Sequence, residues 1–266
     1  MMAQYEPFEV ADGSERIFIL SWEQDLGNAE KTPVYVEVPE DEGQSRIELY
    51  RTAEGWRFEM APTSHAKVVC RLDSSEDFSV AKFSTDPVRS SALFGLNNSL
   101  MLLFAFRTAG MMTLEMHSSV VVNDGKGYMF LGKSGTGKST HSRQWLEHIP
   151  GSVLLNDDNP IIRVEDGVAR VYGSPWSGKT PCYKNADAPI GAIVRIRQHP
   201  ENLIRRQSVV ESYASLYSSC SGLKSQRDIA DGLHSTLEFV AVNVPCFVLD
   251  CRPDHEAADV CHSAVK

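Results

Sequence analysis

The sequence predicts an α/β protein in two parts, a small β-rich N-terminal domain over residues 1–88 and a larger domain with a mixed sheet over residues 89–266. Three observations favour this division. Short runs rich in β-branched and aromatic residues recur as far as residue 83. A hairpin signature then spans residues 119–131. Directly after it, residues 132–139 fit the pattern G-x-x-x-x-G-K-[ST] at every position.

Composition narrows the classes of function. The chain has 266 residues and a net charge of −9, and it contains no long cluster of Lys or Arg, which disfavours a general nucleic-acid binder. Its most apolar run, residues 100–106, is too short to cross a bilayer, and residues 1–7 lack the basic and then apolar pattern of a secretory signal. Neither nucleic acid nor a membrane is therefore expected as a partner.

Cysteine usage points to a reducing environment. The six cysteines, at positions 70, 182, 220, 246, 251 and 261, show neither C-x-x-C spacing nor a companion histidine motif. We expect buried free thiols in a reducing cytoplasm and treat a metal site as the less favoured alternative.

The N-terminal 88 residues are typical of a small antiparallel domain. Six short runs, several of which alternate apolar and polar residues, are separated by acidic or Gly/Pro-containing turns: residues 16–22, 33–38, 46–50, 56–60, 67–72 and 78–83. The third and fourth runs predict a hairpin. These runs hold no catalytic constellation, so this part is expected to cap the larger domain or to present a substrate. Residues 89–109 then predict a mostly buried helix, which Gly95 and residues 97–98 weaken.

The glycine-rich pattern is expected between a buried strand and a helix. Residues 119–122 and 128–131 predict the hairpin strands, and residues 139–149 place apolar side chains on one side of a helix. The glycines let successive backbone N–H groups point at one anion, and the helix that starts near Lys138 adds its positive end. The Lys138 amine can reach terminal phosphates, and the Ser139 hydroxyl can hold magnesium. A surface loop without a ligand is the alternative. The predicted nucleotide-binding residues are Gly132, Lys133, Ser134, Gly135, Thr136, Gly137, Lys138, Ser139 and Thr140.

Two adjacent carboxylates follow this helix. The apolar run 151–155 ends in Asn156, Asp157 and Asp158, at the place where a magnesium ligand or a catalytic base is needed. If the strand continues, the two acids point to opposite faces and can take different roles. We assign Asp157 as the base and Asp158, with Ser139, as the metal ligand, and the reverse assignment stays open. Turn chemistry in Asp-Asp-Asn-Pro is the alternative.

The remaining segments mainly predict packing. Residues 161–164 and 169–172 predict a second hairpin, and residues 173–184 form either a lid that brings Lys179 to the phosphates or a structural loop with Trp176 packed inward. Arg195 and Arg197 share one face of a strand over residues 189–197; either one of them stabilises a transferring phosphate, or the face is a solvated edge. Helices are predicted over residues 209–220, 224–240 and 254–265, with a strand over residues 245–250.

With the hairpin, the loop and the aspartates assembled, about residues 110–200 resemble the HPr kinase/phosphorylase family and the related P-loop of ATP-dependent phosphoenolpyruvate carboxykinase. His117 with residues 120–122 is similar to the family's histidine-containing strand, residues 132–139 fit its loop, and residues 155–158 resemble its aspartate pair. The resemblance implies a P-loop nucleotide-binding domain of this type, ATP and Mg²⁺ as cofactors, an aspartate that activates the acceptor, and His117 near the phosphates. Residues 173–179 depart from the family pattern, so the expected acceptor is not HPr itself.

Two hypotheses of function follow. The first is an ATP- and Mg²⁺-dependent phosphotransferase that moves the terminal phosphate to a hydroxyl of a protein serine or a small molecule, with catalytic residues His117, Lys138, Asp157 and Asp158. The second is a non-catalytic or slowly hydrolysing ATP-binding regulatory module. A carboxykinase is disfavoured, because the chain is short for that family and its organic-acid-binding residues cannot be placed. The acceptor, the donor (ATP, another nucleotide or pyrophosphate) and the oligomeric state, a homo-oligomer included, stay open.

Overall fold

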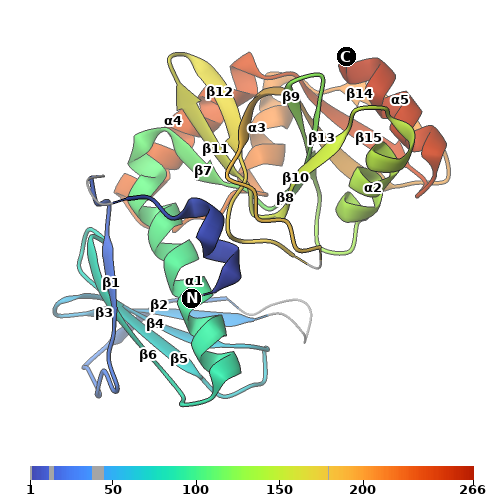
Figure 1. The fold of residues 1–266 in the computed structure, drawn as a ribbon. Coiled ribbons are helices and arrows are strands. Elements are labelled where there is room, and N and C mark those ends of the chain that lie inside the picture. The colour runs from blue at the N-terminus through green and yellow to red at the C-terminus, as the bar shows by residue number, and fades with distance from the viewer. Residues whose placement is uncertain (1, 12–14, 38–44, 179) are drawn as a thin grey trace. The chain divides into compact units, whose positions relative to one another are not determined.

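The computed structural model describes residues 2–11, 15–37, 45–178 and 180–266. The fold is mixed α/β with two mixed sheets (Figure 1), in agreement with the class that the sequence predicts. Contacts divide the chain into two compact units. Gly13–Thr108 form the smaller unit, and Met1–Asp12 together with Ala109–Lys266 form the larger one.

The smaller unit is a six-stranded sheet with one helix. Its strand order is β1-β6-β5-β4-β3-β2, and all neighbours are antiparallel except β1 and β6. The elements are β1 (Ile19–Trp22), β2 (Thr32–Glu37), β3 (Arg46–Thr52), β4 (Gly55–Ala61), β5 (Cys70–Ser74), β6 (Val80–Thr85) and α1 (Arg89–Thr108). The predicted hairpin is present as β3 and β4. The predicted helix is present as α1, and its contacts with β5 and β6 place it in this unit, whereas the sequence analysis assigns it to the larger domain.

The larger unit is built on a nine-stranded sheet. The order is β10-β8-β9-β13-β12-β11-β7, with β15 beside β13 and β14 beside β15. The neighbours β9, β13 and β15 are parallel, and the other pairs are antiparallel. The elements are the 3₁₀ helices η1 (Ala3–Phe8) and η2 (Ala109–Met111), the strands β7 (Thr113–Glu115), β8 (Ser118–Asn123), β9 (Lys126–Leu131), β10 (Val153–Asp158), β11 (Ile161–Glu165), β12 (Val168–Tyr172), β13 (Asp187–Gln198), β14 (Leu203–Arg206) and β15 (Cys246–Cys251), and the helices α2 (Lys138–His148), α3 (Val209–Tyr217), α4 (Arg227–Asn243) and α5 (His255–Val265).

Both hairpins predicted for this unit are present. In β8–β9 the turn residues Asp124 and Gly125 have φ values of 48° and 73°, and in β11–β12 Asp166 and Gly167 have φ values of 49° and 76°. Two consecutive residues with positive φ match the twist of a two-residue hairpin loop, and Asp-Gly sequences favour it. The short strands β7 and β14 are not predicted, because three or four residues give too little periodicity.

The core beside the glycine-rich pattern fixes both of its flanking elements. Trp145 of α2 is fully buried, and its ring centroid lies 5.0 Å from that of Tyr128 and 5.5 Å from that of Phe130, both on β9. Helix α5 packs on α2 and adds Cys261 to the same cluster. The strand before the pattern and the helix after it are therefore held by one apolar core.

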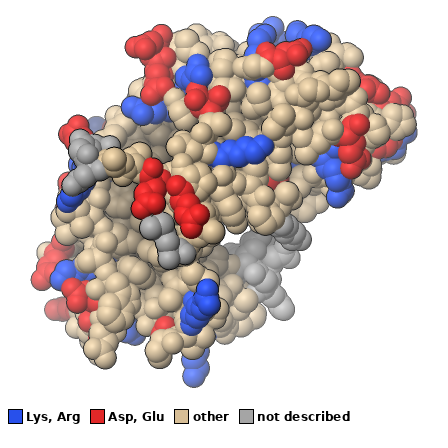
Figure 2. All heavy atoms as spheres, viewed as in Figure 1, with Lys and Arg blue, Asp and Glu red and all other residues tan. Residues whose placement is uncertain are grey.

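Charge is dispersed on the face drawn in Figure 2, where Lys and Arg lie among Asp and Glu. All six cysteines are buried, as the sequence analysis expects. None of the helices in the described ranges combines the length and the apolar character that crossing a bilayer requires.

Candidate functional site

The glycine-rich loop, residues 132–137, connects β9 to α2. Gly137 is the residue that precedes the helix, and its φ of 102° is a backbone conformation that residues with a Cβ rarely adopt. The helix begins at Lys138, as predicted, so the free N–H groups of its first turn face the loop. These groups and the helix dipole favour an anion at this position.

The Lys138 side chain folds back into this loop. Its Nζ lies 3.0 Å from the Gly132 carbonyl oxygen and 2.8 Å from His117 Nε2. The residue is 8 % exposed, and burial lowers the pKa of its amine, against the opposing effect of Asp158 and Asp157. A phosphate would give this amine a charge-assisted hydrogen bond in place of those to a carbonyl and an imidazole.

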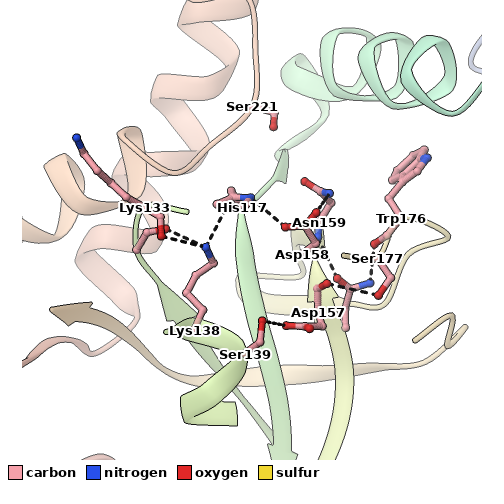
Figure 3. Close-up of polar contacts among 12 residues, drawn as sticks. His117, Lys133, Lys138, Ser139, Asp157, Asp158, Asn159, Trp176, Ser177 and Ser221 are labelled. Atoms are coloured by element: carbon pink, nitrogen blue, oxygen red, sulfur yellow. Dashed lines mark hydrogen bonds and ion pairs between the residues drawn. The ribbon is translucent and has the colours of Figure 1, made fainter. Parts of the chain in front are cut away.

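His117 connects Lys138 to Asp158 (Figure 3). The residue lies between β7 and β8, and its backbone N–H donates to the Ser219 carbonyl oxygen at 2.7 Å. Its Nδ1 is 3.2 Å from Asp158 Oδ1. When Nε2 accepts from the Lys138 ammonium, a neutral imidazole carries its proton on Nδ1, the nitrogen nearest to Asp158. The three side chains thus form one row of polar contacts.

Asp157 faces a different partner. The Ser139 hydroxyl, in the first turn of α2, donates to Asp157 Oδ1 at 2.9 Å. Strand β10 continues through both aspartates, so adjacent side chains leave it in opposite directions. Asp157 is buried and beside the serine, while Asp158 is partly exposed and beside the histidine. The geometry therefore separates two carboxylates whose roles are interchangeable in the sequence.

Residues 173–178 are hydrogen-bonded to the end of β10 that carries the two aspartates. The Asn156 side-chain amide is fully buried and donates to Ser174 Oγ at 3.1 Å and to the Trp176 carbonyl oxygen at 3.1 Å. The Gly178 N–H donates to the Asp157 carbonyl oxygen at 2.6 Å, and a Cβ at Gly178 would lie 3.0 Å from that oxygen. Trp176 is 9 % exposed, in line with the structural-loop alternative for this segment. Lys179, the lysine of the lid alternative, lies outside the described residues.

The two arginines of β13 differ in their surroundings. Arg195 is half-buried and donates to Ser215 Oγ at 2.8 Å, Ser218 Oγ at 2.7 Å and Ser219 Oγ at 2.9 Å. It therefore holds the segment whose Ser219 carbonyl binds the His117 backbone. Arg197 pairs with Asp250 at the surface, with Nε 2.6 Å from Oδ1, which matches the solvated-edge alternative.

Glu115 is a titratable residue of this site that sequence reasoning missed. It ends β7 and is 1 % exposed; its Oε1 accepts from the Ser221 hydroxyl at 3.3 Å, and its Oε2 has no hydrogen-bond partner among the described residues. Burial, with the negative charge of Asp158 in the same sense, raises the pKa of this carboxyl to about 8, although the Ser221 hydrogen bond opposes the shift. Only its position two residues before His117 hints at it in the sequence.

A cavity of about 580 Å³ borders the opposite side of the loop. We call it the β13–β15 cavity, because the carboxyl ends of these two strands form its floor. Of the predicted nucleotide-binding residues, Gly135, Thr136, Gly137 and Thr140 line it, and Ser134 is exposed. The lining residues are Gly135, Thr136, Gly137, Thr140, His141, Gln144, Ile196, Gln198, His199, Pro200, Cys251, Arg252 and Pro253. No pattern in the sequence predicts this cavity, because it joins segments that are distant in the chain.

Lys133 does not line the β13–β15 cavity and lies on the side of the loop near the Lys138 amine. Its carbonyl oxygen lies 3.5 Å from Lys138 Nζ, and its side chain extends away from the other labelled residues in Figure 3.

Comparisons with known proteins find similarity among solved structures. No protein-family model matches this chain, and no curated protein sequence matches it. Among solved structures, it is similar to the HPr(Ser) kinase/phosphatase from Coxiella burnetii, at 14 % identity and a TM-score of 0.34, over 57 % of this chain and 93 % of that one.

Proposed function

We propose that the chain is an ATP- and Mg²⁺-dependent phosphotransferase that moves the terminal phosphate of ATP to a hydroxyl of a protein serine or a small molecule. The observation that supports this function is the pairing of carboxylates with loop residues: Asp158 through His117 to Lys138, and Asp157 to Ser139. Phosphoryl transfer needs little covalent chemistry from a protein, and it depends on such positioning and charge neutralisation.

The residues present fit magnesium. Mg²⁺ takes oxygen ligands, and in phosphate-transferring sites one or two protein oxygens suffice because phosphate and water complete the shell. The Ser139 hydroxyl and the buried Asp157 carboxylate, 2.9 Å apart, offer such a pair. When bound, the ion would neutralise charge on the phosphates. We therefore assign Ser139 and Asp157 to the metal, in place of the Ser139 and Asp158 of the sequence hypothesis.

Asp158 is then the candidate base. Its Oδ1 lies 3.2 Å from His117 Nδ1, a polar contact that orients the carboxylate and leaves its second oxygen, Oδ2, for the acceptor. In the structure described here, Oδ2 accepts a hydrogen bond from the Asn159 side-chain amide at 3.1 Å. The acceptor hydroxyl would pass its proton to Oδ2 as its oxygen bonds to the terminal phosphorus, and ADP would leave with the bridging oxygen.

Lys138 and the first turn of α2 hold the triphosphate. On phosphate binding the Lys138 amine would turn from the Gly132 carbonyl and His117 toward the terminal phosphates. The first-turn N–H groups need no rearrangement, because the helix start already presents them.

The test is phosphate transfer from ATP to a panel of small hydroxy compounds and serine peptides, read by mass spectrometry. We expect Asp158→Asn to lower the transfer rate about 10²- to 10³-fold with ATP affinity retained. Asp157→Asn should instead raise the Mg²⁺ concentration that half-maximal transfer requires, because a proposed ligand of the ion is lost. Asp166→Asn, in a hairpin turn, is the matched control and should change neither quantity.

Two results would overturn the proposal. Release of phosphate only to water would favour the slowly hydrolysing regulatory module. Full transfer by Asp158→Asn would remove the proposed base.

A further inference from the structure

We infer that the N-terminal segment, residues 2–11, positions Asp157 through residues 173–178, and that Tyr5 is the positioning residue that makes the connecting contact. The inference rests on the proposed function for the role of Asp157 as a metal ligand. It adds to the site a residue from the far side of the smaller unit in the sequence.

The N-terminal segment belongs to the larger unit although the smaller unit follows it in the chain. Contacts group Met1–Asp12 with Ala109–Lys266 and leave Gly13–Thr108 as a separate unit. The segment forms the 3₁₀ helix η1, none of whose described side chains is fully buried. A 3₁₀ helix of six residues has little stability of its own, so specific contacts must hold it in place.

Two side-chain hydrogen bonds join η1 to neighbouring residues of the segment 173–178. The Gln4 side-chain amide donates to the Pro175 carbonyl oxygen at 3.3 Å. The Trp176 indole N–H donates to the Tyr5 hydroxyl oxygen at 3.2 Å. Because both contacts fall on consecutive residues, the segment holds one short stretch of backbone rather than a broad surface.

The Tyr5 hydroxyl is suited to this contact. Trp176 is 9 % exposed, and a buried indole N–H usually needs an acceptor. Burial raises the pKa of the Tyr5 phenol, against the opposing effect of the hydrogen bond from Trp176, so the hydroxyl is neutral at pH 7. A third contact, from the Asn185 side-chain amide to the Pro7 carbonyl oxygen at 2.9 Å, anchors the end of η1.

Trp176 passes the constraint on to β10. Its carbonyl oxygen accepts from the fully buried Asn156 amide at 3.1 Å, while its indole donates to Tyr5. Two residues later, the Gly178 N–H donates to the Asp157 carbonyl oxygen at 2.6 Å. The stretch 176–178 is thus bound by the N-terminal segment on one side and by the aspartate strand on the other.

The position of Asp157 matters because of the ion it is proposed to bind. Its Oδ1 lies 2.9 Å from the Ser139 hydroxyl, and these two oxygens are the proposed protein ligands of Mg²⁺. Mg²⁺ demands nearly ideal octahedral geometry, so a small displacement of one ligand weakens its binding. Loosening residues 173–178 should therefore raise the Mg²⁺ requirement of transfer.

The test uses Tyr5→Phe, which keeps the ring and removes the acceptor for the indole. Hydrogen–deuterium exchange read by mass spectrometry should show residues 173–178 exchanging at least threefold faster than in the native chain. Half-maximal transfer should need at least threefold more Mg²⁺, while ATP affinity at saturating Mg²⁺ should change less than twofold. Tyr50→Phe is the matched control: it removes a phenol hydroxyl that donates to Glu48 at 2.5 Å in the smaller unit, and it should match the native chain in all three quantities.

A double-variant cycle separates this route from a general loss of stability. Trp176→Phe removes the indole N–H, so adding Tyr5→Phe to it should raise the Mg²⁺ requirement no further. A full additional rise in the double variant would mean that Tyr5 acts by another route, and would overturn the inference. If Tyr5→Phe fails to fold, Gln4→Met removes the donor to Pro175 and carries the same expectations for exchange and Mg²⁺.

The exchange measurement keeps this inference distinct from the proposed function, because it needs no activity. Native exchange rates in a folded Tyr5→Phe protein would overturn the role of the N-terminal segment and leave the phosphotransferase standing. Faster exchange with an unchanged Mg²⁺ requirement would overturn the link to Asp157. Absence of transfer by the native chain would overturn the proposed function, and with it the link to Mg²⁺, whereas the exchange rates would still decide whether the segment holds residues 173–178.

Discussion

The two sides of the glycine-rich loop differ in charge although one loop borders both. On one side lie His117, Lys138, Asp157 and Asp158, which we call the charged flank. Lys138 is hydrogen-bonded to His117, His117 is paired with Asp158, and Asp157 accepts from the Ser139 hydroxyl. On the other side the β13–β15 cavity, the neutral flank, has apolar walls and a rim cation that is already paired. The difference suggests a division of tasks, because charges stabilise a transferring phosphate while apolar walls bind an uncharged group.

The flanks also differ in how the chain builds them. The charged flank uses residues of 117–158, which lie close in sequence and within one hairpin, one loop and the next strand. The neutral flank joins the loop and α2 to the ends of β13 and β15, which follow 60 and more residues later. The first arrangement can be inferred from local patterns, whereas the second depends on the pairing of distant parallel strands.

The largest effect is expected at Lys138, on the charged flank. Lys138→Ala removes the buried ammonium, and we expect phosphate transfer to fall about 10³-fold, because a preorganised cation is lost at the point where phosphate charge concentrates. ATP and tripolyphosphate should both bind more weakly. Lys126→Ala removes an equal charge at the exposed start of β9 and should leave transfer and binding unchanged. Steady-state kinetics and calorimetry measure the two quantities, and a fully active Lys138→Ala protein would contradict the charged flank altogether.

Glu115 offers the next largest effect, on stability. Its pKa is raised from 4.5 to about 8 in the folded chain, mainly by burial, so the folded state keeps a proton that the unfolded state has lost. The stability that this proton contributes is fully present below about pH 4.5 and is lost as pH rises to about 8. One proton corresponds to about 1.4 kcal/mol per pH unit within that window.

The measurement is the free energy of urea unfolding at pH 5, 6.5 and 8. Glu115→Gln does not titrate, so the native chain should lose stability relative to it as the pH rises. Glu147→Gln, at an exposed position, is the control and should follow the native curve. Parallel curves for native and Glu115→Gln proteins would mean that this carboxyl is ionised in the folded chain, and that the charged flank lacks a buried neutral acid.

Glu115 also shows where prediction from sequence reaches its limit. The loop, both hairpins and α2 follow from turn residues and periodicity that act over a few residues, and these elements are present as predicted. A three-residue strand that ends in a glutamate carries no such signal, because a carboxyl usually indicates surface.

The choice between the aspartates was equally beyond the sequence. The pairing of β10 with β8 shifts register between Leu154 and Asn156, as in a β-bulge. An extra residue reverses which side chains face which side of the sheet. Thus the alternation rule predicted that Asp157 and Asp158 diverge, but it could not assign Ser139 to one and His117 to the other.

A smaller effect tests whether residues 173–178 position the charged flank without contributing to ATP binding. Asn156→Ala leaves the Ser174 and Trp176 groups without the buried amide that binds them, and we expect a loss of about 2 kcal/mol in the free energy of unfolding. Transfer should also fall, because residues 173–178 support Asp157, while ATP affinity should stay the same. Asn123→Ala is the matched control: its buried amide binds the Pro150 carbonyl oxygen at 2.9 Å, so stability should fall similarly with transfer retained. Equal transfer by the two variants would show that residues 173–178 do not position the charged flank.

The smallest expected effect tests whether the group that binds in the β13–β15 cavity is uncharged. Glu256→Gln removes one of the two carboxylates that pair with Arg252 and leaves Asp254 in place. If the cavity holds an uncharged nucleoside, ATP affinity should change less than about twofold, since exposed ion pairs of this kind contribute little. If it instead holds a phosphate or another acid, the partly freed guanidinium should strengthen binding several-fold, and the gain should shrink with added salt. Calorimetry of native and Glu256→Gln proteins at low and high salt distinguishes the two results. A gain in ATP affinity that shrinks with salt would show that the β13–β15 cavity binds a charged group, as the charged flank does.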